Sequence, residues 1–297
     1  MKEENTNFLT TRQLARMWQV SEATVKRWAD AGRLHPSRTL GGHRRFALRE
    51  VLRFQNEQGL DVSRVALTGL GEAAAKLMGS GASEQEGAAE QFFDAIVRGQ
   101  EGASAGVLLS SYMKGVPLVR ILDDTFTEAM HRLGNLWHCG EITVADEHLA
   151  SQTARRAVET LRECIRREAS DGRRAVVCTV EEEMHEMAVL CVQLLLEEKG
   201  WSVGYMGAHT PFYSMTDAIE KQRPQLICIS STTNLALSRN AREYDQFHAE
   251  AAKRGVTVAL GGEGFRDEAI RRRFPAHLHA DNFGDLLEFL QAERSEQ

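Results

Sequence analysis

The sequence lacks the features of a membrane or secreted protein. No apolar run approaches the roughly 20 residues that a membrane-spanning helix needs, and the N-terminal residues Met1–Asn5 show no signal-peptide pattern. Five cysteines form no CxxC pair, and their odd number argues against a disulfide framework. We therefore expect a cytoplasmic protein with no membrane partner.

Two further patterns are missing. No GxGxxG follows the first predicted strand of the C-terminal third, which argues against a classical dinucleotide site. No sustained heptads follow Phe54, so a long dimerisation coiled coil is not predicted there. What is present is a chain of 297 residues, 42% hydrophobic and 26% charged, which is typical of a globular protein with two or three domains.

The charge is unevenly distributed. Residues 1–60 carry 11 Lys and Arg against 6 Asp and Glu, whereas the whole chain has a formal net charge of −6, so the remainder is acidic. A basic head on an acidic body indicates that a polyanion contacts the head only, although many solvated surfaces carry as much charge.

The first segment has the pattern of a helix-turn-helix. Residues 10–15 (TTRQLA) place a hydroxyl and a glutamine at capping-box spacing, and Ser21 can cap a second helix with Val25 and Trp28 facing inward. Gly32 ends that helix as a C′ glycine would. Three side chains are left on its outer surface: Thr24, Lys26 and Arg27.

A short basic wing follows this pair of helices. Residues 40–46 (LGGHRRF) combine a two-glycine turn, three basic side chains and an aromatic anchor, which predicts a β-hairpin able to reach phosphates or a minor groove. The other interpretation is an incidental helical hairpin with a basic loop.

Residues 11–15, 21–28 and 42–46 together resemble the winged helix-turn-helix of MerR-family regulators. The resemblance covers roughly the first 70 residues, and it implies binding to operator DNA as symmetric pairs or larger assemblies. It assigns recognition-helix contacts to Thr24, Lys26 and Arg27, and contacts to the DNA backbone to His43, Arg44 and Arg45.

A helical region follows the small, polar stretch Gly79–Ser83. From about residue 84 to 169, apolar residues recur at helical spacing in four groups, which predicts an antiparallel four-helix bundle. Its end carries an unusual polar and aromatic cluster: Trp137, His138, Glu147 and His148. Taken alone, this cluster is better interpreted as scattered surface residues at a helix junction.

The C-terminal third alternates strands and helices. Four apolar segments are predicted as strands, at 174–179, 202–206, 226–230 and 256–260. Helical stretches separate them, which is the pattern of a doubly wound parallel sheet whose ligands bind at the carboxyl ends of the strands. The sequence therefore predicts a multidomain α and α/β protein with a winged helix-turn-helix at 1–75, a four-helix bundle at 76–170 and a Rossmann-like, flavodoxin-like domain at 171–297.

The loop after the first strand of this domain carries Glu183 and His185. An imidazole held by a carboxylate is the arrangement that orients a metal-ligating histidine. No Cys or His nearby in sequence completes a zinc site, so a lone histidine suits a metal that a macrocycle already holds. A lone loop histidine is, on its own, more often structural or solvated.

This part of the chain resembles cobalamin-binding proteins, in which an acid-x-His-x-x-Gly loop supplies the lower cobalt ligand. The matching residues are Glu183, His185, Ser230, Thr232, Gly261 and Gly262. Glu183 replaces the commoner Asp, and Ala188 stands where Gly is usual. By the resemblance, His185 ligates cobalt and the other loops line a slot for the nucleotide tail.

The three parts of the chain in this order resemble the B12-dependent light-sensing repressors of the CarH type. The resemblance includes the bundle motif, in which Glu147-His148 follows Trp137 after nine intervening residues. This resemblance implies adenosylcobalamin as cofactor and a homotetramer that binds DNA in the dark. It also implies that Trp137, Glu147 and His148 surround the adenosyl group. His138 then becomes the upper cobalt ligand after light has cleaved the Co–C bond.

Three other functions remain open. A B12 enzyme or methyl-transfer module has a similar cap and cobalamin domain but no use for a DNA-binding head, so we expect no enzyme. The other two are a light-independent cobalamin-sensing regulator and a cobalamin-independent MerR-family regulator.

Overall fold

The computed structural model describes residues 8–39, 41–58 and 86–295. It divides into two compact units, Met1–Arg166 and Arg167–Gln297. The predicted linker at Gly79–Ser83, Leu40 of the wing and the boundary near residue 75 lie outside the described residues, so the division into three domains stays a prediction.

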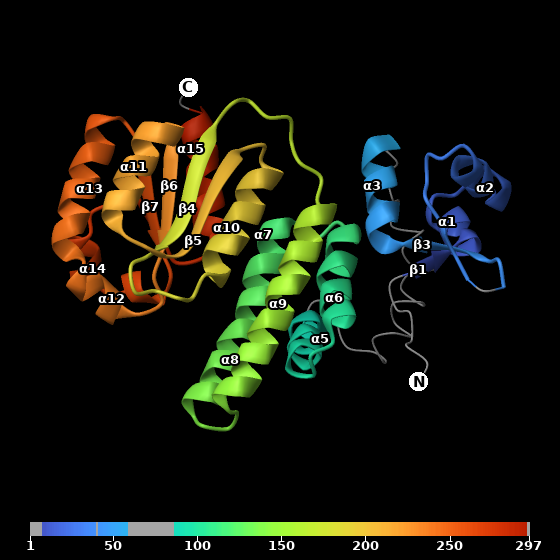
Figure 1. The fold of residues 1–297 in the computed structure, drawn as a ribbon, viewed down its shortest axis with the longest axis horizontal. Helices are drawn as coiled ribbons and strands as arrows, with labels where there is room; N and C mark the ends of the chain where they lie inside the picture. The colour runs from blue at the N-terminus through green and yellow to red at the C-terminus, as the bar shows by residue number, and fades with distance from the viewer. Residues whose placement is uncertain (1–7, 40, 59–85, 296–297) are drawn as a thin grey trace. The chain divides into compact units, whose positions relative to one another are not determined.

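Residues 8–58 of the first unit form a small α/β head (Figure 1). Its elements are β1 (Phe8–Thr10), α1 (Thr11–Met17), α2 (Glu22–Asp30), β2 (Ser37–Arg38), β3 (Arg44–Ala47) and α3 (Leu48–Gln58). The strands form an antiparallel sheet in the order β1-β3-β2. Strands β2 and β3 form the predicted wing, with Arg38 opposite Arg44.

The helix ends of the head follow the predicted capping. Thr10 caps α1 in a capping box, because its hydroxyl accepts from the N–H of Gln13 while the Gln13 side chain accepts from the N–H of Thr10. Ser21 caps α2. Gly32 lies just beyond α2 with a φ of 67°, the left-handed conformation that favours glycine.

Helix α3 was not predicted, and aromatic packing holds it against the first two helices. The ring of Phe54 lies 5.3 Å from that of Trp18 and 5.0 Å from that of Trp28. Trp28, as predicted, therefore contributes to the interior of the head.

Residues 86–164 form the predicted helical bundle (Figure 1). Its elements are α5 (Glu86–Val97), α6 (Glu101–Met113), α7 (Leu118–Arg120), the π-helical segment η1 (Ile121–Thr127), α8 (Glu128–His138) and α9 (Val144–Cys164). The third predicted helix is thus an uninterrupted stretch from Leu118 to His138 with a π-helical segment inside it. Thr143 caps α9 in a second capping box, so this helix begins at Val144.

The second unit is a doubly wound α/β domain (Figure 1). Its strands are β4 (Arg174–Val180), β5 (Ser202–Thr210), β6 (Leu226–Ser230), β7 (Thr257–Gly261) and β8 (Leu278–Ala280). They pair in parallel in the order β5-β4-β6-β7-β8. Strand β6 is buried along its whole length, which explains why it is a continuous apolar run.

Helices cover both faces of this sheet. Those described are α10 (Met187–Glu198), α11 (Phe212–Gln222), α12 (Asn234–Arg239), α13 (Ala241–Lys253), α14 (Glu268–Arg273) and α15 (Phe283–Ser295), with a 3-10 turn η2 (Glu263–Phe265). Helices α11 and α13 pack an aromatic core against one face, and α10 lies on the other (Figure 1). Strand β8 and helices α12 and α15 were not predicted, because a three-residue strand such as LHA carries no periodic signal.

Candidate functional site

The strand order locates the ligand-binding edge of the sheet. Strand β4 comes first in sequence yet lies between β5 and β6, so the connections from β4 and β6 leave in opposite directions. In such sheets the crevice at this switch point, beyond the carboxyl ends of the strands, is where ligands bind. The loops that follow β4, β6 and β7 meet there, and they carry the residues that were predicted as the lower cobalamin site.

A buried carboxylate connects two of these loops. Glu183, 1% exposed, follows β4. Its Oε1 accepts from the backbone N–H of His185 at 3.0 Å and from the His185 ring Nδ1 at 2.5 Å. Its Oε2 accepts from the backbone N–H groups of Thr232 at 2.7 Å and Thr233 at 3.0 Å, which follow β6. One side chain therefore fixes the imidazole and ties it to the neighbouring loop.

The hydrogen bonds determine the ionisation of Glu183 and the tautomer of His185. Burial by itself would raise the pKa of Glu183, but the hydrogen bonds from the His185 ring, the His185 N–H and the N–H groups of Thr232 and Thr233 lower it to about 2. Because an ionised carboxylate only accepts, the neutral imidazole of His185 carries its proton on Nδ1. Nε2 is then the unprotonated nitrogen, the form that ligates a metal, on a side chain that is 61% exposed.

The loops after β6 and β7 approach each other closely. Gly262 has a φ of 93°, and a Cβ there would lie 2.5 Å from the carbonyl oxygen of Ser231 and 2.9 Å from Oγ of Ser230. A side chain at position 262 would therefore close the space beside Ser230. The Oγ of Ser230 is buried and has no hydrogen-bond partner in the structure. An unsatisfied buried hydroxyl beside a glycine cradle fits a polar group of a ligand inserted between the strands.

The other predicted cofactor residues lie in the first unit, at one end of the α8–α9 hairpin. Trp137 and His138 occupy the last turn of α8, and Glu147 and His148 the first turns of α9. Trp137 is 47% exposed, which is unusual for a side chain of that size. Glu147 Oε1 accepts from Ser151 Oγ at 2.5 Å, and its Oε2 lies 3.7 Å from His148 Nε2. This end of the bundle thus presents an aromatic ring and polar groups to its surroundings.

The head presents a second surface of interest. Lys26 and Arg27 are exposed on α2, and His43 is exposed on the wing, as predicted. Thr24 is half-buried rather than fully exposed, since its hydroxyl lies 3.0 Å from Oγ of the capping residue Ser21.

Arg44 connects the wing to α2. Its Nη2 lies 2.5 Å from Oδ1 of Asp30, and its Nη1 donates to the carbonyl of Lys26 at 3.1 Å. The Arg44 side chain is only 19% exposed. Both acceptors belong to the C-terminal half of α2, where the helix dipole favours a cation. In this arrangement the guanidinium of Arg44 is directed toward α2, whereas Arg45 is half-buried.

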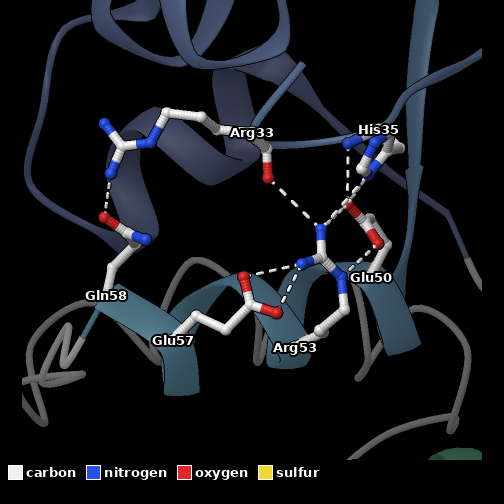
Figure 2. A network of polar contacts seen from close by, with 6 residues as sticks. All are labelled: Arg33, His35, Glu50, Arg53, Glu57 and Gln58. Atoms are coloured by element: carbon white, nitrogen blue, oxygen red, sulfur yellow. Dashed lines mark hydrogen bonds and ion pairs between the residues drawn. The ribbon is translucent and has the colours of Figure 1, made fainter. Parts of the chain in front are cut away.

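A polar network joins α3 to the segment that follows α2 (Figure 2). Figure 2 shows Arg53 of α3 between Glu50 and Glu57, with Nη2 of Arg53 also donating to the carbonyl of Arg33 at 3.2 Å. Glu50, whose side chain is 16% exposed, accepts from the N–H of His35 at 2.7 Å. Burial would raise the pKa of Glu50, but the bonds from Arg53 and His35 lower it to about 2. The network fixes the segment after α2 against α3.

Comparison with known proteins shows matches to a helix-turn-helix domain and to B12 binding domains. The model of a helix-turn-helix domain matches residues 8–59, and two models of a B12 binding domain match residues 88–162 and 173–278. The chain is similar to the HTH-type transcriptional repressor CarH of Myxococcus xanthus, with 27% identity over 83% of this chain and 86% of CarH. It is also similar to the HTH-type transcriptional repressor CarA of the same organism, with 29% identity over 87% of this chain and 88% of CarA.

The resemblance to CarH-type, B12-dependent regulators is confirmed. The predicted fold class is confirmed as well. The monomethylamine corrinoid protein of Methanosarcina barkeri matches 70% of this chain and 98% of its own with a TM-score of 0.60, at 17% identity. That likeness shows a shared fold for the bundle and the α/β domain.

The predicted cofactor residues fall into two groups in this chain. One group lies at the edge of the sheet in the second unit and consists of Glu183, His185, Ser230, Thr232 and Gly262. The bundle residues form their own group at the α8–α9 end of the first unit.

Other residues at these candidate sites carry no signal in the sequence. The N–H of Thr233 bonds to the Glu183 carboxylate, and no motif identifies it because the contact spans 50 positions of sequence. Arg38 is exposed on β2, and its position opposite Arg44 depends on strand register.

Two kinds of feature are absent from the part of the chain that the structure describes. Within residues 8–39, 41–58 and 86–295, no helix has the length and apolar character to cross a membrane. The same part of the chain holds no cluster of three or more Cys, His, Asp or Glu side chains placed to bind a metal ion by themselves.

Proposed function

We propose that this chain is a light-responsive transcriptional repressor with adenosylcobalamin as its chromophore and operator DNA as its partner. In the dark it is a homotetramer bound to DNA, and light dissociates the tetramer. Its functional parts are the head up to about residue 75, the bundle up to about residue 170 and the α/β domain beyond.

The observation that carries the proposal is the Glu183–His185 pair. The carboxylate holds the ring at Nδ1 and leaves Nε2 in the form that ligates cobalt. The unsatisfied hydroxyl of Ser230 beside Gly262 supports a slot for the nucleotide tail of the cofactor. A lone imidazole would be sufficient here, because the corrin ring and the adenosyl group would supply the other cobalt ligands.

The bundle residues have separate tasks in this proposal. Trp137 covers the adenosyl group, and Glu147 and His148 form hydrogen bonds around it. Bound adenosylcobalamin supplies a Co–C bond that light cleaves. His138, exposed beside Trp137, would then hold cobalt in place of the adenosyl group, and the accompanying change of contacts at the end of the bundle would provide the free-energy difference that a switch requires.

The head supplies DNA binding. Thr24, Lys26 and Arg27 of α2 contact bases, while His43 and Arg45 of the wing contact the DNA backbone. Arg44 contributes by holding the wing against α2. One head contacts few base pairs, so a tetramer that presents several heads to a repeated operator binds much more tightly than a single head.

The decisive experiment is size-exclusion chromatography with absorbance detection on protein loaded with adenosylcobalamin. The sample is run in the dark and again after green light. The proposal requires a dark oligomer that becomes smaller in light, together with a spectrum that changes to cobalt with two imidazole ligands. Cobalamin binding with no change in size or spectrum would leave a light-independent cobalamin-sensing regulator. No cobalamin binding would leave a cobalamin-independent regulator.

His138→Ala tests the assignment of the upper ligand. The variant should still release the adenosyl group in light but should form no stable product with two imidazole ligands. His131→Ala is the matched control, since His131 is also exposed on α8 but lies two turns earlier. A lit spectrum of His138→Ala identical to that of the wild type would contradict the assignment.

An enzymatic role is the other class of function. B12-binding domains also occur in corrinoid proteins such as that of Methanosarcina barkeri. The helix-turn-helix head at residues 8–59 favours the repressor, because methyl transfer requires no DNA-binding domain.

A further inference from the structure

Two residues with a strained backbone lie side by side at the predicted cobalt site. Glu182, one residue before Glu183, has a φ of 66°, and His209 near the end of β5 has a φ of 54°. Left-handed backbone is uncommon and unfavourable for residues other than glycine, and it concentrates at functional sites. These two residues are hydrogen-bonded to each other, because the N–H of Glu182 donates to Nδ1 of His209 at 2.8 Å.

His209 owes its position to an irregularity in the sheet. Cys178 pairs with Gly207 and Val180 pairs with Thr210, so two residues of β5 lie opposite one residue of β4. Such a bulge bends the strand and redirects a side chain. It directs the backbone N–H of His209 toward β4, where it bonds to the carbonyl of Glu183 at 2.9 Å and to Oγ1 of Thr179 at 3.0 Å.

The loop after β4, which carries the predicted cobalt ligand His185, is therefore held by hydrogen bonds on two sides. On the β6 side, the Glu183 carboxylate binds the backbone of Thr232 and Thr233. On the β5 side, the backbone of Glu182 and Glu183 binds His209 through both its ring and its N–H. Because Nδ1 of His209 accepts this hydrogen bond, its lone pair is the side-chain acceptor for the backbone N–H of Glu182.

We infer that His209 is a positioning residue for the cobalt ligand. Its Nδ1 holds the left-handed backbone of Glu182, which aims the Glu183 carboxylate at His185 and so presents Nε2 of His185 to cobalt. The inference rests on the proposed function for the identity of the metal. It assigns a role in cofactor binding to a residue that bonds the backbone of Glu182 and Glu183.

Two variants separate backbone strain from the acceptor. His209→Gly relaxes the left-handed backbone but removes the acceptor. His209→Asn keeps an acceptor close to the position of Nδ1, and Asn tolerates left-handed backbone better than most residues. Arg239→Ala is the control, because Arg239 bonds the Glu182 side chain at 2.6 Å and not its backbone.

The probe is adenosylcobinamide, added in the dark to the full-length protein. This corrinoid lacks a nucleotide tail with its own base, so a lower nitrogen ligand must come from the protein. Its visible absorbance band moves to longer wavelength when an imidazole binds cobalt. We expect the coordinated band for wild type, His209→Asn and Arg239→Ala, and about tenfold weaker coordination for His209→Gly, the effect of one hydrogen bond to the loop.

Hydrogen exchange of the apoprotein provides a readout that needs no corrinoid. The peptide spanning residues 180–187 should exchange faster in His209→Gly than in wild type and His209→Asn. Full coordination and unchanged exchange in His209→Gly would overturn the inference, and so would loss of coordination in the Asn and Gly variants alike. If wild-type protein shows no coordinated band with adenosylcobinamide or adenosylcobalamin, the proposed cobalamin site fails, and the inference falls with it.

Discussion

Glu183→Gln removes the charge that organises the edge of the sheet. Each Glu183 oxygen accepts two close hydrogen bonds, one oxygen from His185 and the other from Thr232 and Thr233. A glutamine amide replaces one oxygen with an NH2 group, which opposes two donors whichever way it is turned. The Glu183 side chain is 1% exposed, so water does not compensate for the loss.

The size of the effect follows from the pKa. Lowering the pKa of Glu183 from 4.5 to about 2 corresponds to about 3 kcal/mol of stabilisation at neutral pH. Because the pKa is lower in the folded protein, this stabilisation is complete above pH 4.5 and is lost as the pH falls toward 2. We expect the free energy of unfolding of Glu183→Gln to be about 3 kcal/mol lower than that of wild type at pH 7. Between pH 4.5 and 2, the variant should lose no further stability through titration of this group.

Hydrogen exchange measured by mass spectrometry on the full chain is the suitable assay, because it reports on each segment separately. Amides at residues 179–186 and 230–234 should lose roughly two orders of magnitude of protection at pH 7. Glu182→Gln is the matched control: Glu182 is the exposed neighbour, and its ion pair with Arg239 contributes at most about 1 kcal/mol. Equal protection in wild type and Glu183→Gln would refute the view that this carboxylate ties the two loops together.

Three further predictions concern the head and the slot. Asp30→Asn should weaken binding to a DNA duplex three- to tenfold although it removes a negative charge, because Arg44 loses its ion-pair partner. Fluorescence anisotropy measures this binding, and a salt titration of Arg44→Ala should give the same dependence of affinity on salt concentration as wild type. A slope lower by about 1 would mean that Arg44 contacts a phosphate. Gly262→Ala should destabilise the second unit by about 2 kcal/mol and abolish cobalamin binding, because its Cβ would lie 2.5 Å from the carbonyl oxygen of Ser231; retention of binding in equilibrium dialysis would show that the slot is not used. Glu50→Gln should destabilise the head by about 1–2 kcal/mol at pH 7 and by little below pH 2, since the pKa of Glu50 is lowered to about 2; equal amide protection of residues 33–36 in both proteins at pH 7 would argue against this.

Local chemistry explains what was predictable in the fold. Capping at Thr10 and Ser21 depends on residues three positions apart, and the glycine after α2 depends on backbone conformation alone. The bundle helices and the central strands were predictable from the spacing of their apolar residues. Burial of one helix face, or of a whole strand, produces a pattern that can be recognised along the chain. Strand β8 carries too short a signal and exists because β7 offers it an edge to pair with.

The candidate site was predictable only in part. The pairing of Glu183 with His185 follows from two positions in one loop, and the structure contains it as predicted. Arg44 shows what such reasoning leaves out: a basic residue in a wing predicts a phosphate contact, and only the structure shows that Asp30 of α2 lies beside it. Sequence spacing carries no information about a partner 14 residues away on another element.

The sequence by itself determined the element types, the order of the head, bundle and α/β domain, and the residue types suited to DNA and to cobalamin, because these depend on neighbours within a few positions. Only the tertiary structure decided that Glu183 also binds the backbone of Thr232 and Thr233, that Ser230 is buried without a partner, and that His209 supports the ligand loop. Each of these contacts joins loops after different strands. Their geometry depends on strand order, register and a bulge, which are properties of the assembled sheet rather than of any segment of the chain.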